Sequence, residues 1–217
     1  KKGRNLALCA RRMDRLETLK TELLAINPQI TVLIKQLDVN EHEQVFDVFN
    51  AFNQELGQLD RIIVNAGMGK GASIGTGLFH ANKQTAETNF VAALAQCEAA
   101  MMIFRAQNHG HLVTISSISA VRGFRRAMTV YAATKAAITS LTEGIRIDVM
   151  NTPIKVTCIH PGFIRSEINE KVENVPFIVD TETGCKAMVS AIEKEKANAY
   201  VPNYPWAVLH WVLRIAP

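Results

Sequence analysis

The chain has 217 residues, of which 48% are hydrophobic and 20% are charged, and its formal net charge is +4. These values are typical of a single globular domain with a sizeable core. The mild charge and the lack of a long Lys/Arg run argue against a nucleic-acid partner. No apolar run approaches the roughly 20 residues that span a bilayer, so we expect no transmembrane segment.

The cysteines are scattered along the chain, at Cys9, Cys97, Cys158 and Cys185. They form no CxxC pair and no Cys/His cluster, so we expect neither a metal site nor a disulfide framework. Free thiols are typical of proteins in a reducing compartment, so the expected localisation is cytoplasmic.

Apolar strand-like runs alternate with helix-length segments along the chain. In order, the expected strands are Asn5–Ala10, Ile30–Gln36, Arg61–Asn65, His111–Ser116, Ile154–Ile159 and Ala199–Pro202. The expected helices lie near Met13–Ile26, Glu41–Leu56, Ala81–Gln107, Met128–Met150 and Thr181–Lys196. This alternation predicts an α/β fold, with right-handed crossovers onto a doubly wound parallel sheet and helices on both faces. The domain covers residues 1–202, and an apolar tail at residues 203–217 follows it.

Tyr131 and Lys135 stand four residues apart at the start of an Ala-rich helix, so their side chains share one helix face. A free tyrosine has a pKa of about 10 and transfers protons poorly near neutrality. A cation beside it favours the phenolate and lowers that pKa. The pair therefore suits proton exchange with a substrate oxygen, although a Tyr and a Lys at this spacing are also common by chance.

The Tyr131 and Lys135 pair belongs to an ordered set of short motifs. In chain order these are Asp38-Val39, Asn65-Ala66-Gly67, Asn89 in Thr88-Asn89-Phe90, Ser117, Tyr131 with Lys135, and Pro161-Gly162 with Ser166. The set resembles the short-chain dehydrogenase/reductase family, from about Gly3 to Pro202. The resemblance implies a Rossmann-type fold that transfers hydride between a nicotinamide cofactor and a small-molecule carbonyl or alcohol substrate.

The resemblance also implies catalytic roles. Tyr131 is the general acid in reduction and the general base in oxidation, and Lys135 lowers its pKa. Ser117 holds the substrate oxygen, with Ser119 as an alternative because the loop before Tyr131 is about one residue longer than is common. Asn89 kinks its helix and holds a water that relays protons through Lys135.

Arg11-Arg12 ends the first strand, where an acidic residue would bind the ribose 2′-hydroxyl of NAD and an Arg accommodates the 2′-phosphate of NADP. Because the guanidinium fork pairs with phosphate oxygens, we expect NADP(H). Alternatively, both arginines only solvate a helix start. The other implied cofactor contacts are Asp38 and Val39 at the adenine, Asn65, Ala66 and Gly67 under the adenosine ribose, Tyr131 and Lys135 at the nicotinamide ribose, and Pro161, Gly162 and Ser166 at the carboxamide. Asp38 would also suit the N-cap of the helix that follows.

Lys1-Lys2-Gly3 leads directly into what resembles the second strand of the family. The first strand of the family and its Gly-rich phosphate turn would lie upstream, and that strand is central in a 3-2-1-4-5-6 order. We therefore expect open edges on the strands at 5–10 and 61–65. We interpret the sequence as part of a longer chain, with a truncated, inactive relative as the alternative. The glycines from Gly67 to Gly77 follow a strand but do not form the phosphate turn.

Two long helices are richer in alanine than a single sheet-facing stripe requires. The alanines are Ala92, Ala93, Ala95, Ala99 and Ala100 in the first helix, and Ala136 and Ala137 in the second. A helix that is apolar on more than one face is usually buried on more than one side, so we expect a homodimer or homotetramer; alternatively, alanine only favours helix. The tail Trp206–Ile215 suits packing over a pocket or on another subunit, with a membrane interface as the alternative.

Two other functions stay open from the sequence. One is a non-catalytic binding or regulatory relative of the same family. The other is a non-redox relative, such as an epimerase or dehydratase, although these usually carry a larger C-terminal substrate region. The segment Phe163–Val179 is expected to form a substrate lid, and it gives only an apolar hint of the substrate.

Overall fold

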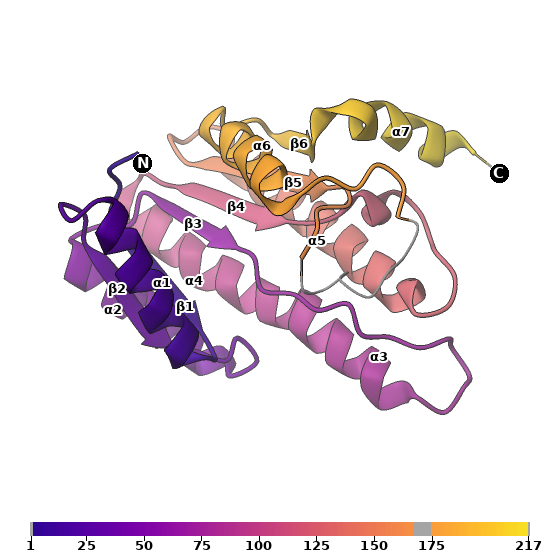
Figure 1. Cartoon of the computed structure of the whole chain (residues 1–217), viewed down its shortest axis with the longest axis horizontal. Coiled ribbons are helices and arrows are strands. Elements are labelled where there is room, and N and C mark those ends of the chain that lie inside the picture. Colours follow the sequence, from indigo (N-terminus) through magenta and orange to yellow (C-terminus); the bar gives the residue numbers. More distant parts are fainter. Residues whose placement is uncertain (1, 167–174, 217) are drawn as a thin grey trace.

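The computed structural model, which describes residues 2–166 and 175–216, has parallel strands that alternate with helices (Figure 1). The strands are β1 (Leu6–Ala10), β2 (Val32–Gln36), β3 (Arg61–Val64), β4 (His111–Ile115), β5 (Lys155–Pro161) and β6 (Asn198–Val201). The helices are α1 (Met13–Ile26), α2 (His42–Leu56), α3 (Phe79–Ala86), the π-turn η1 (Glu87–Val91), α4 (Ala92–Gln107), the 3-10 turn η2 (Ile118–Val121), α5 (Met128–Asp148), α6 (Thr181–Glu193) and α7 (Asn203–Ile215). Every strand pair is parallel, which confirms the predicted α/β class.

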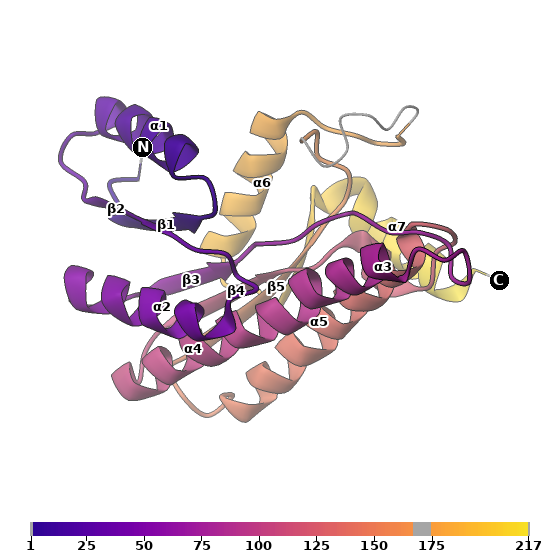
Figure 2. The ribbon, with the colours of Figure 1, turned by 90° about the horizontal axis from the view of Figure 1, so that it is seen from below.

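The sheet consists of two groups of strands. In one group β1 pairs with β2, and in the other the order is β3-β4-β5-β6. Among the described residues, β1, β2, β3 and β6 each pair on one side only, and the edges of β1 and β3 are those expected from the sequence. In Figure 2, α1 and α6 lie on one side of the strands, and α2, α4 and α5 lie on the other. The α1 side of β3 is less covered, since Ile63 there is 47% exposed while Ile62 and Val64 are buried.

Two segments differ from the expected helices. The helix expected over Ala81–Gln107 is interrupted, because the π-turn η1 separates α3 from α4. The apolar tail forms α7, a helix that the sequence pattern did not predict. No helix of the described residues is long and apolar enough to span a membrane.

The main core lies where α2 and α4 pack on β3 and β4. Phe104, Leu112 and Val45 are fully buried there. The small side chains of α4 allow this close packing, and Ala92, Ala93, Ala99 and Ala100 are all buried within the single chain. These four alanines therefore give no support to the expected homodimer or homotetramer, because packing within one chain already buries them. A smaller cluster, with Val113, Ile159, Ile192, Ala199 and Val201, packs under α6.

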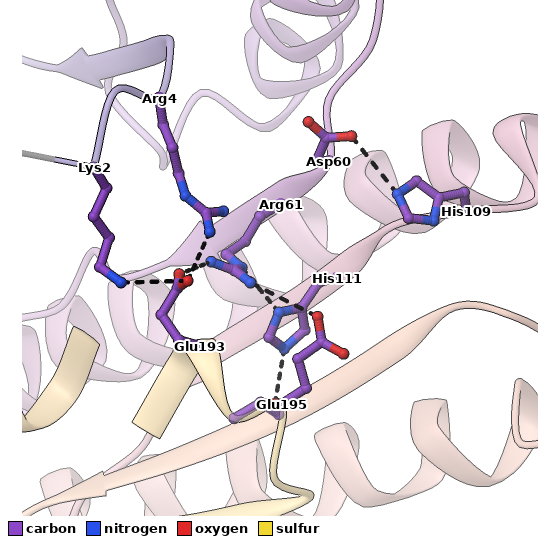
Figure 3. A network of polar contacts seen from close by, with 9 residues as sticks. Lys2, Arg4, Asp60, Arg61, His109, His111, Glu193 and Glu195 are labelled. Carbon is purple, nitrogen blue, oxygen red and sulfur yellow. Dashed lines mark hydrogen bonds and ion pairs between the residues drawn. The ribbon is translucent and has the colours of Figure 1, made fainter. Parts of the chain in front are cut away.

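A polar network joins the amino-terminal ends of the strands (Figure 3). The Arg61 Nε–H donates to His111 Nδ1 at 2.9 Å, and His111 Nε2 lies 2.8 Å from Thr157 Oγ1. Arg61 donates to the Oε1 of Glu193 and Arg4 donates to its Oε2, each at 2.6 Å. Because Arg4 precedes β1 and Arg61 begins β3, Glu193 connects the two strand groups. Parallel sheets bind ligands at their carboxyl ends, so this network lies at the opposite end.

We predict that stability falls as the pH falls from about 6.5 towards 4, because of His111. Burial and, to a smaller extent, the neighbouring Arg61 cation lower the pKa of His111 to about 4. In the unfolded chain this pKa is about 6.5, so in that range the unfolded state binds a proton that the folded state excludes. The free energy of unfolding should drop by up to roughly 3 kcal/mol between those pH values.

Urea unfolding at a series of pH values measures this dependence. His111→Gln is the control, since it keeps a hydrogen-bonding side chain that does not titrate. Burial also lowers the pKa of His160 and of His210, so the informative quantity is the difference in slope between the parent protein and the variant. Equal slopes would show that His111 is not responsible.

Candidate active site

Ser117, Tyr131 and Lys135 come together at the carboxyl end of β4. Ser117 follows this strand and caps η2, accepting hydrogen bonds from the Ser119 N–H and hydroxyl at 3.2 and 3.0 Å. Tyr131 lies in the first turn of α5, and Lys135 lies one turn later on the same face. The Lys135 Nζ is 5.8 Å from the Tyr131 ring centroid and donates to the carbonyl oxygen of Ile115 at 2.8 Å. The predicted side-by-side arrangement of Tyr131 and Lys135 is therefore present.

The serines at the end of β4 have different surroundings. The Ser116 hydroxyl is buried and donates to the Lys135 carbonyl oxygen at 2.8 Å, so it faces the α5 backbone. Ser117 points to the opposite side, as successive strand residues do, and hydrogen-bonds the Tyr131 side chain. Ser119 is buried and donates to Ser117. Ser117 therefore lies next to the Tyr131 phenol, and the hydrogen bond from Ser119 helps to hold Ser117 in place.

Burial controls the protonation of the Tyr131 and Lys135 pair. It raises the pKa of Tyr131, and the hydrogen bond from Ser117 opposes this only in part. It lowers the pKa of Lys135, which is 5% exposed, to about 8. The net direction is therefore opposite to the expected lowering of the Tyr131 pKa, because desolvation of the phenol is the largest cause. Tyr131 is thus a neutral phenol at neutral pH.

Asn89 lies in the π-turn η1 and is 1% exposed. Its Oδ1 accepts from the Met68 N–H at 2.7 Å, and its Nδ2 donates to the Met68 carbonyl oxygen at 2.9 Å and to Thr134 Oγ1 at 3.2 Å. The side chain therefore satisfies both backbone polar groups of Met68 and reaches α5. This geometry agrees with a kinked helix at Asn89, and the kink is a π-turn, a feature frequent at functional sites.

Gly67 lies against Asn89 and Lys135. A Cβ on Gly67 would lie 3.4 Å from Asn89 Oδ1 and 3.5 Å from Lys135 Nζ. Asn65 and Ala66 lead from β3 into this loop, and the Asn65 side chain is exposed at the carboxyl end of the sheet. The loop after β3 therefore reaches the site at which Tyr131 and Lys135 meet.

Arg11 and Asp38 line a cavity of about 340 Å³ at the carboxyl ends of β1 and β2, together with Gln36, Leu37 and Gln44. The Arg11 Nη1 is 3.9 Å from the Asp38 Oδ2. A cation next to a carboxylate at this position suits an adenosine with its ribose phosphate, so these residues fit a dinucleotide.

Asp38, Val39 and Arg12 lie at or near this cavity and make different contacts. Asp38 Oδ1 accepts from the Asn40 N–H at 3.0 Å, while Glu41 occupies the N-cap position of α2, so the N-cap alternative for Asp38 is wrong. Val39 packs on the main core. Arg12 occupies the N-cap position of α1 without a side-chain capping bond.

Pro161 and Gly162 end β5, and Trp206 of α7 packs directly on Gly162. A Cβ on Gly162 would overlap the indole ring at Nε1, Cε2 and Cδ1. Phe163 meets the same indole edge to face, with ring centroids 5.5 Å apart. Ser166 is exposed and lies at the end of a described segment. Of the expected lid, residues 167–174 lie outside the described residues.

The sequence analysis missed His160. This buried side chain precedes Pro161 and hydrogen-bonds the Ser117 backbone, while its Nε2 lies 3.3 Å from Asn198 Oδ1. Its ring stacks on Tyr200 with centroids 5.0 Å apart. His160 therefore holds the ends of β4 and β5 in register beside the site. A polar residue at the end of an apolar strand was the available signal.

We predict that Gly162→Ala destabilises the protein by about 1–3 kcal/mol, because the new methyl group overpacks against Trp206. Urea unfolding measures the change. Gly123→Ala is the matched control, since a Cβ there meets nothing within 4 Å. In a Trp206→Leu background the Gly162→Ala cost should shrink. An equal cost in both backgrounds would show that the indole is not the obstacle.

The model of the short chain dehydrogenase family matches residues 1–176. An uncharacterized oxidoreductase of Mycobacterium tuberculosis is 50% identical over 214 residues, which cover 97% of this chain and 85% of the relative. An uncharacterized oxidoreductase of Myxococcus xanthus is 28% identical over 207 residues, which cover 95% of this chain and 79% of that protein.

Solved structures share the fold. A short chain dehydrogenase/reductase from Burkholderia phymatum in complex with NAD has a TM-score of 0.84 at 19% identity, covering 97% of this chain and 83% of its own. An alcohol dehydrogenase from the archaeon Thermococcus sibiricus, complexed with 5-hydroxy-NADP, has a TM-score of 0.79 at 20% identity, covering 91% of this chain and 84% of its own. Both nicotinamide cofactors therefore occur among proteins with this fold.

Proposed function

The chain belongs to the short-chain dehydrogenase family of oxidoreductases, and from this premise we propose that it transfers hydride between NADP(H) and a carbonyl or alcohol substrate. The observation that carries the proposal is the meeting of Ser117, Tyr131 and Lys135 at the carboxyl end of β4. Ligands of open α/β sheets bind at this end. A small, hydrophobic carbonyl compound suits the aromatic side chains that follow β5.

In this proposal the neutral phenol of Tyr131 gives its proton to the substrate oxygen during reduction, and the phenolate takes a proton back during oxidation. The raised pKa of Tyr131 supports the acid role, since the phenol keeps its proton at neutral pH. Ser117 orients the substrate oxygen through its hydroxyl. The nicotinamide, when bound, supplies the hydride chemistry.

Lys135 and Asn89 support Tyr131. With a pKa of about 8, the Lys135 ammonium is charged at neutral pH and releases its proton more easily than an exposed lysine. This suits a proton relay that ends at the phenol. Asn89 holds Met68 and Thr134, so it fixes the loop and the helix between which the relay would run.

The cofactor-binding residues in this proposal line the carboxyl ends of four strands. Arg11 faces the ribose phosphate, with Arg12 beside it, and Asp38 with Val39 contacts the adenine. The loop Asn65-Ala66-Gly67 lies under the adenosine ribose, and Tyr131 and Lys135 approach the nicotinamide ribose. Pro161, Gly162 and Ser166 hold the carboxamide. Arg11 supports NADP(H) in this proposal, because its guanidinium pairs with phosphate oxygens while an acidic residue would be expected for NAD.

We further propose a cytoplasmic location and a homodimer or homotetramer. The cysteines of the described residues are all free thiols, which suits a reducing compartment. The apolar side chains of Val91 in η1, Met102 in α4 and Ile147 in α5 are exposed in the single chain. Exposed apolar side chains on these two long helices suit a two-fold interface.

Tyr131→Phe should lower kcat for carbonyl reduction by at least about 100-fold, because it removes the proton donor and keeps the ring. The Kd for NADPH should stay within about 2-fold, since the backbone and the ring packing are kept. Loss of nicotinamide absorbance with a reducible carbonyl gives the rate, and calorimetry gives the Kd. Substantial turnover by the variant would refute the role of Tyr131.

NADPH should bind more tightly than NADH, and Arg11→Asp should narrow or reverse this preference. The substitution removes the phosphate-pairing guanidinium and places a second carboxylate beside Asp38. Calorimetric titration with both cofactors measures the ratio of affinities. Lys186→Asp on α6 makes the same change in net charge at an exposed site and should leave the ratio unchanged. A parent protein that prefers NADH would contradict the cofactor assignment.

Light scattering at micromolar concentration should give a mass of two or four chains. Met102→Glu should shift it towards the monomer, because a buried unpaired carboxylate is costly at an interface. Ile26→Glu on α1 is the matched control, since both side chains are 59% exposed in the single chain. If the parent protein is active as a monomer, the proposed homodimer or homotetramer is refuted.

A further inference from the structure

Trp206 carries a polar group without a partner. Its side chain is 4% exposed in the first turn of α7, and its Nε1–H has no acceptor within hydrogen-bonding distance in the part of the chain that the structure describes. An indole nitrogen only donates. Leaving a buried donor unpaired costs about 1–3 kcal/mol, and such groups are rare in native proteins.

Two phenylalanine rings pack on this indole. Phe163 and Phe177 meet the indole edge to face, with ring centroids 5.5 and 6.0 Å away. A buried water needs two to four polar partners, and these rings offer none. A phenylalanine would fill the same space without an unpaired group. The N–H is therefore explained better by an acceptor that arrives with a ligand.

The unpaired donor lies at the end of the sheet where the site lies. The pyrrole edge of the indole faces Gly162, directly after β5. Helix α7 packs on β6 (Figure 1). It also packs on η2, the turn that Ser117 caps. Arg122 donates to the carbonyl oxygens of Leu213 and Ala216 at 3.4 and 3.0 Å and so holds the far end of α7 to the loop after η2.

We infer that Trp206 is a ligand-binding residue, whose indole N–H donates a hydrogen bond to a carbonyl oxygen of the ligand bound at the end of β5. The inference rests on the proposed function. Two ligands of that site carry such an oxygen: the carboxamide of the nicotinamide ring, and a carbonyl substrate. The indole then completes the binding site together with Gly162, and α7 becomes part of the site.

The protein labelled with ¹⁵N in its tryptophan indoles tests this directly. The signal of Trp206 is identified by its loss in Trp206→Phe, and Trp211, which is exposed, serves as the internal control. One arm compares NADP⁺ with 2′-phospho-ADP-ribose, which lacks the nicotinamide. A second arm adds acetophenone to the NADP⁺ complex. A downfield shift and slower hydrogen exchange of the Trp206 N–H are expected in one arm, while the Trp211 signal stays in place.

The arm that moves the signal identifies the source of the oxygen. A shift with NADP⁺ but not with 2′-phospho-ADP-ribose assigns the carboxamide, and a shift only with acetophenone assigns the substrate. Binding of both probes without any shift overturns the inference and leaves the proposed function standing. Failure of the protein to bind NADP⁺ in calorimetry refutes the proposed function, and this inference with it.

Trp206→Phe gives an independent measurement, since it keeps an aromatic ring and removes the N–H. The affinity for the ligand identified above should fall about 5- to 10-fold, the value of one hydrogen bond. The free energy of unfolding should stay equal or rise, because an unpaired buried group is gone. Trp211→Phe should change neither quantity. A purely structural tryptophan would lose stability and keep its affinity, which would refute the inference.

Discussion

The side-chain amide of Asn89 holds together the three segments on which the candidate site depends. It binds both backbone polar groups of Met68 and reaches Thr134, so the loop after β3, the turn η1 and helix α5 share one buried partner. The π-turn turns this side chain inward, because its wider turn carries one residue more than an α-helical turn. Position 67 suits a glycine for the same reason, since Asn89 and Lys135 leave little room for a side chain there.

Burial determines the electrostatics of the site more than the pairing of charges does. Desolvation raises the pKa of Tyr131 and lowers that of Lys135, so each group is driven towards its uncharged form. A phenol that keeps its proton at neutral pH, next to an amine that releases its proton more easily than an exposed lysine, suits proton transfer to a substrate oxygen. The same burial leaves the indole N–H of Trp206 without solvent, which makes a ligand oxygen a favourable partner.

The polar groups at the two ends of the sheet serve different purposes, stability at one end and the candidate site at the other. At the amino-terminal ends, Arg61, His111 and Glu193 form a closed network in which every charged group is paired, and it connects the two strand groups. At the carboxyl ends, Ser117, Tyr131 and Lys135 meet beside the loops that follow the strands. Stability and chemistry are therefore separated in space, so a change in the network should alter folding without reshaping the site.

The sequence by itself determined the alternation of strands and helices, because apolar runs and their periodicity depend only on neighbouring residues. All six strands and the helices α1, α2 and α5 were predicted within about two residues. It also brought Tyr131 and Lys135 together, since an i, i+4 spacing fixes their face. Only the tertiary structure decided the pKa directions, the π-turn at Asn89, the place of His160 and the contact of Trp206 with Gly162. Each of these depends on burial or on contacts between residues far apart in the chain, which local patterns do not specify.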